Sequence, residues 1–279
     1  MANVIELEAT DLASMLCSRV CHDLLNPVGA IGNGLEMLDD PSQAGMAEAS
    51  RSLIASSAKQ ARVKLEFARL AYGASSSKAG SQIDTRECER VARLLFEIEK
   101  AELDWQVPLI MLPKNKAKLF MNMLLIAATS VPRGGKVVAK IEGATDAEVF
   151  TFTSSSDAAL KQRTLMPASA EALLSGNPPE GVDARGIQPF YTGMLARMSD
   201  MSLDISLLDG EFRFAATPQV AAATAEIAPP ETAPAETTET TPTETGSTEP
   251  KASSEGESAS VAPDSAGSEP FTETDQKSA

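Results

Sequence analysis

The sequence has 279 residues, of which 43% are hydrophobic and only 4% aromatic, so a core would be packed mainly by Ala, Leu and Met. The net charge is −15, but the segment from Pro218 to the end holds 12 acidic residues and 2 lysines, which leaves −5 for residues 1–217. This balance argues against nucleic-acid binding, which needs a basic patch. No run approaches the roughly 18 apolar residues of a membrane span.

The compartment is predicted from the N-terminus and the cysteines. The first residues, MANVIELEATDL, contain no basic region followed by an apolar stretch, so we expect no signal peptide. Cys17, Cys21 and Cys88 make no even disulfide framework and fit a reducing environment. We therefore expect a cytoplasmic protein that does not associate with a membrane.

Residues 8–74 are predicted to form an antiparallel helical hairpin. The first helix starts near Thr10 or Asp11 and ends at Asp39-Asp40-Pro41, because proline disfavours helix in the residue before it. The second runs from about Ser42 to Tyr72 and stops at Gly73. Both helices carry apolar residues at three- and four-residue spacing. These are Leu12, Leu16, Val20, Leu24, Val28, Ile31, Leu35 and Leu38, then Met46, Leu53, Ile54, Ala61, Leu65, Ala68 and Tyr72.

A lone hairpin cannot bury such stripes. Two helices of about 30 residues need a second layer, and a second copy of the chain supplies one directly. We therefore predict a homodimer whose two hairpins form a four-helix bundle. The alternative is that the stripe docks onto the rest of the same chain, and sedimentation at micromolar concentration separates the two.

The mixed order of helix and strand signals in residues 81–216 predicts an α+β sandwich, with helices on one face of a mostly antiparallel sheet. Asp84-Thr85-Arg86-Glu87 has the form of a capping box, and Asp209-Gly210 is a hairpin signal. The expected helices cover 84–103, 114–131, 157–174 and 187–199. The expected strands cover 105–112, 136–142, 148–154, 203–208 and 211–215.

Residues 217–279 form a third zone, rich in Ala, Thr, Glu, Ser and Pro, with Phe271 as its only aromatic residue. Such a segment buries too little apolar surface to offset its ordering entropy, so we expect it to be disordered. Solubility is the simpler role for this acidic tail, and binding to a specific partner is the alternative.

The only histidine, His22, lies in the stretch that is richest in candidate functional residues, Arg19-Val20-Cys21-His22-Asp23-Leu24-Leu25-Asn26-Pro27. His22 and Asn26 are four residues apart and share a helix face that avoids the apolar stripe, so the imidazole is expected in solvent. Asp23 can hydrogen-bond one ring nitrogen, which fixes the tautomer and leaves the other nitrogen as a nucleophile. These features predict a surface phosphoryl carrier.

Pro27 lies deep inside the first helical pattern, where proline costs about 3 kcal/mol. It removes one backbone hydrogen bond and should bend the helix just after His22. The carbonyl groups freed there, together with Gly29, would let a partner approach closely. Pro27 lies five residues after the only histidine, and this placement favours a functional role for the proline.

Other roles for His22 are open to the same residues. A lone histidine is more often structural than functional. A zinc site built from Cys17, Cys21 and His22 is disfavoured, because adjacent residues point apart on a helix. An acyl-transfer triad needs a nucleophile whose position the sequence does not supply.

The pattern His-Asp-x-x-Asn-Pro resembles the H-box of bacterial histidine kinases, and the hairpin around it resembles their dimerisation and histidine phosphotransfer domain. By position, His22 matches the phosphorylated histidine and Asp23 its acidic partner. Asn26 matches the polar residue of the box, and Pro27 matches the kink.

The second domain resembles the ATP-binding sandwich of these kinases (Bergerat or GHKL-like) in a degenerate form. Residues 118–127 look like the N-box helix, and Asn122 matches its first asparagine. The second falls on Ile126, which cannot ligate a cation that prefers oxygen. Thr153-Ser154-Ser155-Ser156-Asp157 replaces the Asp-x-Gly-x-Gly box, and residues 186–193 replace the glycine-rich loop. We therefore expect no ATP binding.

A kinase-like architecture with a retained histidine and a lost nucleotide site resembles the ChpT-type histidine phosphotransferases of alphaproteobacteria. The resemblance covers about residues 8–215 and is strongest at 17–31, 118–138 and 186–198. It implies a dimeric relay protein in a cell-cycle-type phosphorelay. The implied donor is the receiver domain of a CckA-like hybrid histidine kinase, and the implied acceptors are CtrA-like and CpdR-like response regulators. No cofactor is implied for this chain, because the receiver brings the Mg²⁺.

Partner specificity is expected on the bundle surface around His22. The candidate contact residues are Ser18, Arg19, Asn26 and Gly29, with Lys59 and Arg62 of the second helix as further candidates. Basic groups there would favour an acidic receiver pocket. Two other functions remain open: an active histidine autokinase, and a non-catalytic scaffold that binds receivers.

Overall fold

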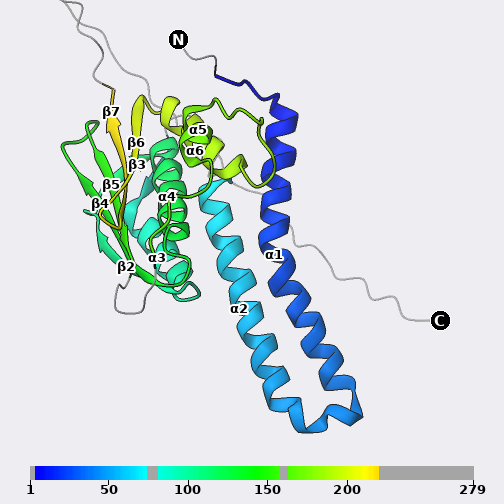
Figure 1. Ribbon diagram of the computed structural model, residues 1–279. Coiled ribbons are helices and arrows are strands. Elements are labelled where there is room, and N and C mark those ends of the chain that lie inside the picture. The colour runs from blue at the N-terminus through cyan, green and yellow to red at the C-terminus, as the bar shows by residue number, and fades with distance from the viewer. Residues whose placement is uncertain (1–3, 74–80, 157–162, 220–279) are drawn as a thin grey trace, which may run out of the picture. The chain divides into compact units, whose positions relative to one another are not determined.

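The computed structural model describes residues 4–73, 81–156 and 163–219, all within one unit, Met1–Thr224. A helical hairpin comes first in the chain and an α/β sandwich follows it (Figure 1). This is the predicted fold class. Nearly all of the predicted acidic tail lies outside the described residues, as does the first part of the helix expected at 157–174.

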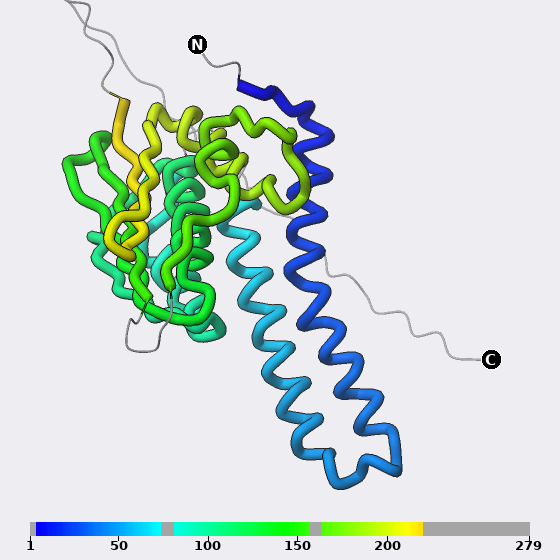
Figure 2. The backbone as a smooth tube through the Cα atoms, in the orientation of Figure 1, coloured from blue at the N-terminus to red at the C-terminus, as the bar shows by residue number. Residues whose placement is uncertain are grey.

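The hairpin consists of α1 (Ala9–Asp39), a 3₁₀ turn (Pro41–Met46) and α2 (Ala47–Ala71). The two helices run antiparallel and extend well beyond the sandwich (Figure 2). Asp40 organises the turn, because its carboxylate accepts hydrogen bonds from the Ser42 backbone N–H at 2.9 Å and the Ser42 hydroxyl at 2.7 Å. These bonds, with one from Gln43, hold the pKa of Asp40 below its usual value.

Gly34 is buried in α1 against α2. A Cβ atom at this position would lie 2.7 Å from Cγ1 of Ile54 and 3.3 Å from the carbonyl oxygen of Ser50. A larger residue at position 34 would therefore require the Ile54 side chain to move.

The apolar stripe of the hairpin is only partly covered. Val28 and Leu35, which the periodicity assigns to the stripe, are 55% and 50% exposed. Leu25 and Leu65 are also more than half exposed. Apart from its contacts with the sandwich, the main neighbours of α1 among the described residues are α2 and the 3₁₀ turn, and one neighbouring helix cannot cover a stripe this wide.

The sandwich contains a five-stranded sheet of order β2-β4-β5-β7-β6. Only the β2–β4 pair is parallel, and the other three pairs are antiparallel, as a mostly antiparallel sheet requires. A separate antiparallel pair, β1 with β3, was not predicted. The strands are β1 (Gln82–Asp84), β2 (Ala101–Gln106), β3 (Met111–Pro113), β4 (Gly135–Glu142), β5 (Val149–Ser155), β6 (Met201–Leu208) and β7 (Glu211–Pro218).

Helix α4 (Lys114–Thr129) lies between the sheet and the hairpin (Figure 1). Its Phe120 contacts Phe150 and Phe152 of the sheet at ring-centroid distances of 5.2 and 4.7 Å. The other helices of the sandwich are α3 (Thr85–Phe96), α5 (Ala170–Ser175) and α6 (Ile187–Arg197). The N-terminal part of α1 packs on α6, where Leu12, Met15 and Leu16 surround Phe190 and Ile187. Part of the α1 stripe thus docks onto the same chain.

Several predicted boundaries are wrong. The helix expected at 84–103 ends at Phe96, because residues 101–106 pair in parallel with β4 instead. Residues 163–169 of the expected helix 157–174 are not helical; Pro167 interrupts them and Ser169 has a φ of 54°. The last strand continues past Ala215 to Pro218, which pairs with Met201.

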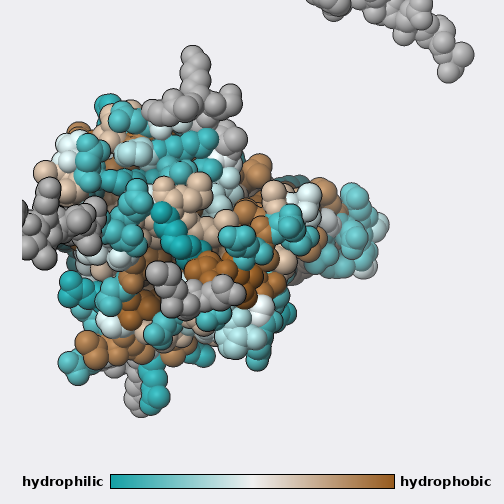
Figure 3. Space-filling model, turned by 90° about the horizontal axis from the view of Figure 1, so that it is seen from above, coloured by the Kyte–Doolittle hydropathy of each residue, from teal (hydrophilic) through white to brown (hydrophobic). Residues whose placement is uncertain are grey.

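The surface of the described residues mixes both kinds of side chain. Seen from above, hydrophilic groups cover much of the sandwich, and hydrophobic groups are exposed in several patches (Figure 3). Within the described residues, no helix combines the length and the apolar character needed to cross a bilayer.

Candidate functional site

His22 lies on the surface of α1, with 72% of its side chain exposed. Its Nδ1 lies 3.4 Å from Oδ1 of Asp23, the contact expected to set the tautomer, although it is long for a hydrogen bond. Nε2 has no partner among the described residues. When Nδ1 carries the proton toward Asp23, Nε2 presents its lone pair to solvent.

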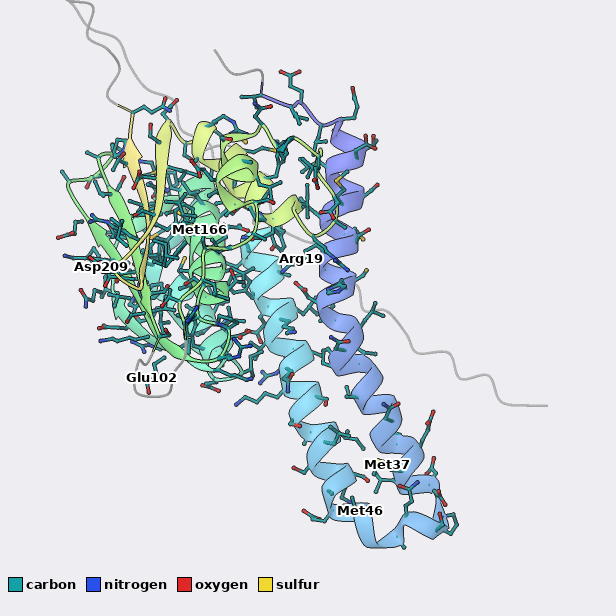
Figure 4. The ribbon with its side chains drawn as sticks, viewed as in Figure 1. Arg19, Met37, Met46, Glu102, Met166 and Asp209 are labelled. Carbon is teal, nitrogen blue, oxygen red and sulfur yellow. The ribbon has the colours of Figure 1, made fainter. Side chains whose placement is uncertain are left out.

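Asp23 is held from the other side by Arg19. The Arg19 Nε donates to Oδ2 of Asp23 at 3.0 Å, an ion pair one helical turn apart that is 24% and 32% exposed. Arg19 projects from α1 on the side nearer α2 (Figure 4). The Asp23 carboxylate therefore bridges His22 and Arg19, which fixes its orientation at both oxygens.

Helix α1 continues through the buried Pro27. Since Pro27 has no N–H, the carbonyl oxygen of Asp23, four residues earlier, lacks its helical donor. The Lys64 Nζ of α2 donates to that oxygen at 3.3 Å. The second helix thereby reaches the residue that contacts His22.

A cavity of about 160 Å³ adjoins this turn. Hairpin and sandwich both line it, with Arg19, Asp23 and Lys64 on one side and Leu125 and Thr129 of α4 on the other. Tyr72 also lines it, and burial raises the pKa of Tyr72, so its hydroxyl stays neutral. The charged groups of the turn thus border a partly apolar recess.

Of the cysteines near His22, Cys21 is disfavoured as a second nucleophile. Cys17 and Cys21 are exposed, and a hydrogen bond with Cys17 raises the pKa of Cys21, which disfavours its thiolate. Burial raises the pKa of Cys88, in the sandwich core, to about 12. Within the described ranges, no group of three or more His, Cys, Asp or Glu residues could hold a metal ion.

The predicted partner-binding residues differ in what they contact. Ser18 and Asn26 are exposed on the face of His22, and a Cβ on Gly29 would have no neighbour within 4 Å. Lys59 instead pairs with Glu97 at 2.8 Å, and Arg62 with Glu66 at 3.7 Å. Lys64, which was not predicted from the sequence, is the α2 cation bonded to the His22 turn.

Asn122, the candidate N-box asparagine, is completely buried in α4. Its Nδ2 donates to the carbonyl oxygens of Ala71 at 3.1 Å and Lys118 at 2.9 Å. Its Oδ1 accepts a hydrogen bond from Nε2 of Gln188 in α6 at 3.2 Å. The amide therefore joins α2, α4 and α6 and has no free donor.

Lys118 completes this junction from one turn earlier in α4. Its Nζ donates to the carbonyl oxygen of Tyr72 at 3.2 Å, so Lys118 and Asn122 together satisfy the last carbonyl groups of the hairpin. Burial lowers the pKa of Lys118, with Lys114 as a second cause. Ile126, one turn after Asn122, is buried among apolar residues.

The segment that replaces the glycine-containing box is engaged within the sandwich. The Ser154 hydroxyl donates to the Ala127 carbonyl at 3.0 Å. The Ser156 backbone N–H donates to Oγ1 of Thr164, also at 3.0 Å. Both serines therefore serve the packing of β5 and the segment after it.

Residues 85–211 match the family described as the histidine phosphotransferase C-terminal domain. The protein phosphotransferase ChpT of Brucella abortus (strain 2308) is 42% identical over 218 residues, which cover 77% of this chain and all of that protein. A solved structure titled as a bacterial phosphotransferase, at 1.7 Å, matches with a TM-score of 0.69 and 40% identity, over 77% of this chain and all of the other. The histidine kinase AdeS of Acinetobacter baumannii matches with a TM-score of 0.38 and 9% identity, over 71% of this chain and 96% of its own.

The family match and the relative from Brucella abortus define the class as phosphotransfer proteins of two-component phosphorelays. The chain belongs to the ChpT family of histidine phosphotransferases.

Proposed function

We propose that His22 receives a phosphoryl group from the aspartyl phosphate of one receiver domain and passes it to the aspartate of another. The observation that carries this proposal is the exposed imidazole whose Nδ1 faces Asp23 while Nε2 is free among the described residues. The family relationship supports phosphotransfer in general, and His22 is the only histidine in the chain.

The transfer requires little chemistry from this chain. Nε2 of His22 attacks the phosphorus in line, the N–P bond forms, and the bond between phosphorus and the receiver carboxylate breaks. The reverse reaction returns the group to a second carboxylate. Asp23 stabilises the positive charge that the phosphorylated ring carries on Nδ1, and Arg19 keeps Asp23 oriented. The receiver domain supplies the Mg²⁺, so this chain needs no cofactor of its own.

We further propose that the chain does not bind ATP. A nucleotide-bound Mg²⁺ needs free oxygen ligands, but Asn122 is buried with its amide bonded to Ala71, Lys118 and Gln188. Ile126 offers no ligand at the second position. The residues present therefore do not fit this ion, and an active autokinase is disfavoured.

A homodimer is proposed from the uncovered stripe of the hairpin. Leu25, Val28, Leu35 and Leu65 are each at least half exposed, and α1 lacks a second helical neighbour along this stretch of the described chain. A second hairpin packed against these residues would bury them in a four-helix bundle. A single sedimenting species at the monomer mass would refute this assembly.

The specific partners are proposed from the resemblance to the ChpT type. The donor is the receiver of a CckA-like hybrid histidine kinase, and the acceptors are CtrA-like and CpdR-like response regulators, in a cell-cycle-type phosphorelay. We place this relay in the cytoplasm. Ser18, Asn26 and Gly29 form the exposed docking surface beside His22.

A reconstituted transfer assay tests the proposal. A phosphorylated receiver domain is mixed with the wild-type chain or with His22→Ala, and label on the chain is followed over time. We expect uptake by the wild type and none by His22→Ala, with sedimentation of the two unchanged. Equal labelling of both would exclude His22 as the carrier, and labelling by ATP alone would restore the autokinase. A scaffold would alter receiver behaviour without taking up label.

A further inference from the structure

The hydrogen bond of Lys64 is explained by the chemistry of proline. In a continuous helix, the N–H of residue 27 would bond the carbonyl of residue 23, but Pro27 has no N–H to donate. The Asp23 carbonyl is thus the single acceptor that Pro27 deprives of its helical donor. Lys64 Nζ donates to that oxygen and to no other backbone atom among the described hydrogen bonds.

The location of Lys64 makes this bond a link between two helices. Asp23 lies 18 residues before the turn that joins the helices, and Lys64 lies 18 residues after it. The two residues therefore face each other across the antiparallel hairpin. Lys64 is half-buried and lines the recess with Arg19 and Asp23.

We propose that Lys64 is a positioning residue for phosphotransfer, which takes over the backbone hydrogen bond that Pro27 removes and so fixes the helical turn carrying His22 and Asp23. This inference rests on the proposed role of His22. Lys64 acts through the main chain of Asp23, whereas Arg19 acts through its side chain at 3.0 Å. Asp23 is therefore held at its backbone carbonyl by Lys64 of α2 and at its side-chain carboxylate by Arg19 of α1.

The bond matters because Asp23 precedes a proline-induced break in the hydrogen-bond ladder. Without a donor, its carbonyl turns toward water and the turn can tilt. The contact from Oδ1 of Asp23 to Nδ1 of His22 is already 3.4 Å, so a small tilt would separate them. Loss of Lys64 should therefore slow the transfer step more than it weakens receiver binding.

A double-mutant cycle between Lys64 and Pro27 tests the mechanism. Lys64→Met is expected to lower the maximal rate of phosphate uptake roughly threefold to tenfold, the range for one hydrogen bond. The receiver concentration at half-maximal rate should stay within about twofold, and Lys64→Arg, which keeps a long cationic donor, should retain at least about half of the rate. In the Pro27→Ala background, residue 27 donates to the carbonyl itself, so Lys64→Met should have little further effect.

Lys140→Met is the matched control, because it removes a lysine charge from β4, where Lys140 pairs with Glu142 at 2.8 Å. Its rate should equal that of the wild type. Equal losses from Lys64→Met in the wild-type and Pro27→Ala backgrounds would overturn the proposal, since Lys64 would then act on the receiver or the phosphoryl group directly. A loss confined to receiver affinity would overturn it as well.

Thermal unfolding of the same four proteins of the cycle separates this inference from the proposed function. The hydrogen bond predicts that Lys64→Met lowers the Tm when Pro27 is present and has a smaller effect in the Pro27→Ala background. If the wild type takes up no phosphate while this coupling is present, the carrier role fails and the bond stands. If uptake is normal and neither the Tm nor the rate is coupled, the role of Lys64 fails and the carrier role stands.

Discussion

Two polar clusters of the protein, one at His22 and one at Asn122, occupy positions that resemble functional boxes of histidine kinases, yet their surroundings are opposite. His22 is mostly exposed, and its Nε2 is free among the described residues. Asn122 is fully buried, and its amide is bonded to the hairpin, to its own helix and to α6.

The two clusters differ in exposure and in unused bonding capacity. An imidazole in solvent can accept a phosphoryl group without disturbing the fold. An amide whose donors and acceptor are satisfied inside the protein stabilises the junction of helices and has nothing left for a ligand. The two motifs therefore leave different bonding capacity for a ligand.

The strongest test of the structural role is Asn122→Leu. The substitution removes the two hydrogen bonds that the Asn122 amide donates, and it leaves the Ala71 carbonyl without this donor. Gln188 loses its bond to the Asn122 side chain but keeps its bond to the backbone carbonyl of residue 122 at 3.0 Å. We expect the free energy of unfolding to fall by about 3 kcal/mol, measured by denaturant unfolding. The exposed Asn177→Ala is the control and should stay within about 0.5 kcal/mol of the wild type. Unchanged stability of Asn122→Leu would remove the contrast between the clusters.

The N-terminal turn of the same helix supplies a test based on pH. Lys116 of α4 pairs with the buried Glu148 at 2.7 Å. Burial acts to raise the pKa of Glu148, but hydrogen bonds from Lys116 and from backbone N–H groups outweigh it, so the pKa is lowered. Stability from this carboxylate is therefore complete above the unfolded-state pKa of about 4.3 and is lost as the pH falls through the lower folded-state value.

Glu148→Gln should lower the free energy of unfolding at pH 7 by about 2 kcal/mol, because Lys116 loses its buried partner. The difference from the wild type should begin to shrink as the pH falls below the unfolded-state pKa of about 4.3, and it should shrink further as the pH passes through the lower folded-state pKa. Unfolding measured from pH 3 to 8 checks both statements, with the exposed Glu142→Gln as control. A difference that is constant over this range would contradict the assigned charge of Glu148.

At the exposed cluster, Asp23→Asn should affect rate without affecting the fold. The amide cannot pair ionically with Arg19 or balance the charge of a phosphorylated ring, so we expect the maximal uptake rate to fall roughly tenfold. Time courses of phosphate uptake, quenched at intervals and run at a saturating concentration of phosphorylated receiver domain, measure this effect. Asp11→Asn, in the first turn of α1, should leave the rate unchanged. A large drop in Tm for Asp23→Asn would mean that this cluster is structural too.

The smallest effect is expected at Gly29, where an added Cβ has no neighbour within 4 Å. Gly29→Ala should therefore raise the free energy of unfolding by up to about 1 kcal/mol. Gly29→Arg should slow uptake by obstructing the receiver, while Gly32→Arg, also in open space but farther from His22, should obstruct less. If both arginine variants transfer at the wild-type rate, the docking surface lies elsewhere.

Local features of the sequence predicted the hairpin and the His22–Asp23 contact well, because both depend on residues within one or two helical turns. The single strand predicted at 105–112 is instead the end of β2 and the start of β3, and the β1–β3 pair was not predicted. Both strands pair with residues far along the chain, which local sequence patterns do not reveal. The hydrogen bond between Gln188 and Asn122 could not be predicted either, because the two residues are 66 positions apart in the sequence. The contact of Lys64 could have been predicted from the sequence. Pro27 shows that the carbonyl of Asp23 lacks its helical donor, and the register of the hairpin shows that Lys64 lies opposite it.

The most direct test of the carrier role is to locate the phosphoryl group on the chain. The full chain is incubated with a phosphorylated receiver domain, quenched at alkaline pH and mapped by mass spectrometry. We expect phosphate on the peptide containing His22, labile in acid and stable in alkali, and none after incubation with ATP and Mg²⁺ alone. Phosphate on any other residue, or on the chain after ATP alone, would contradict it.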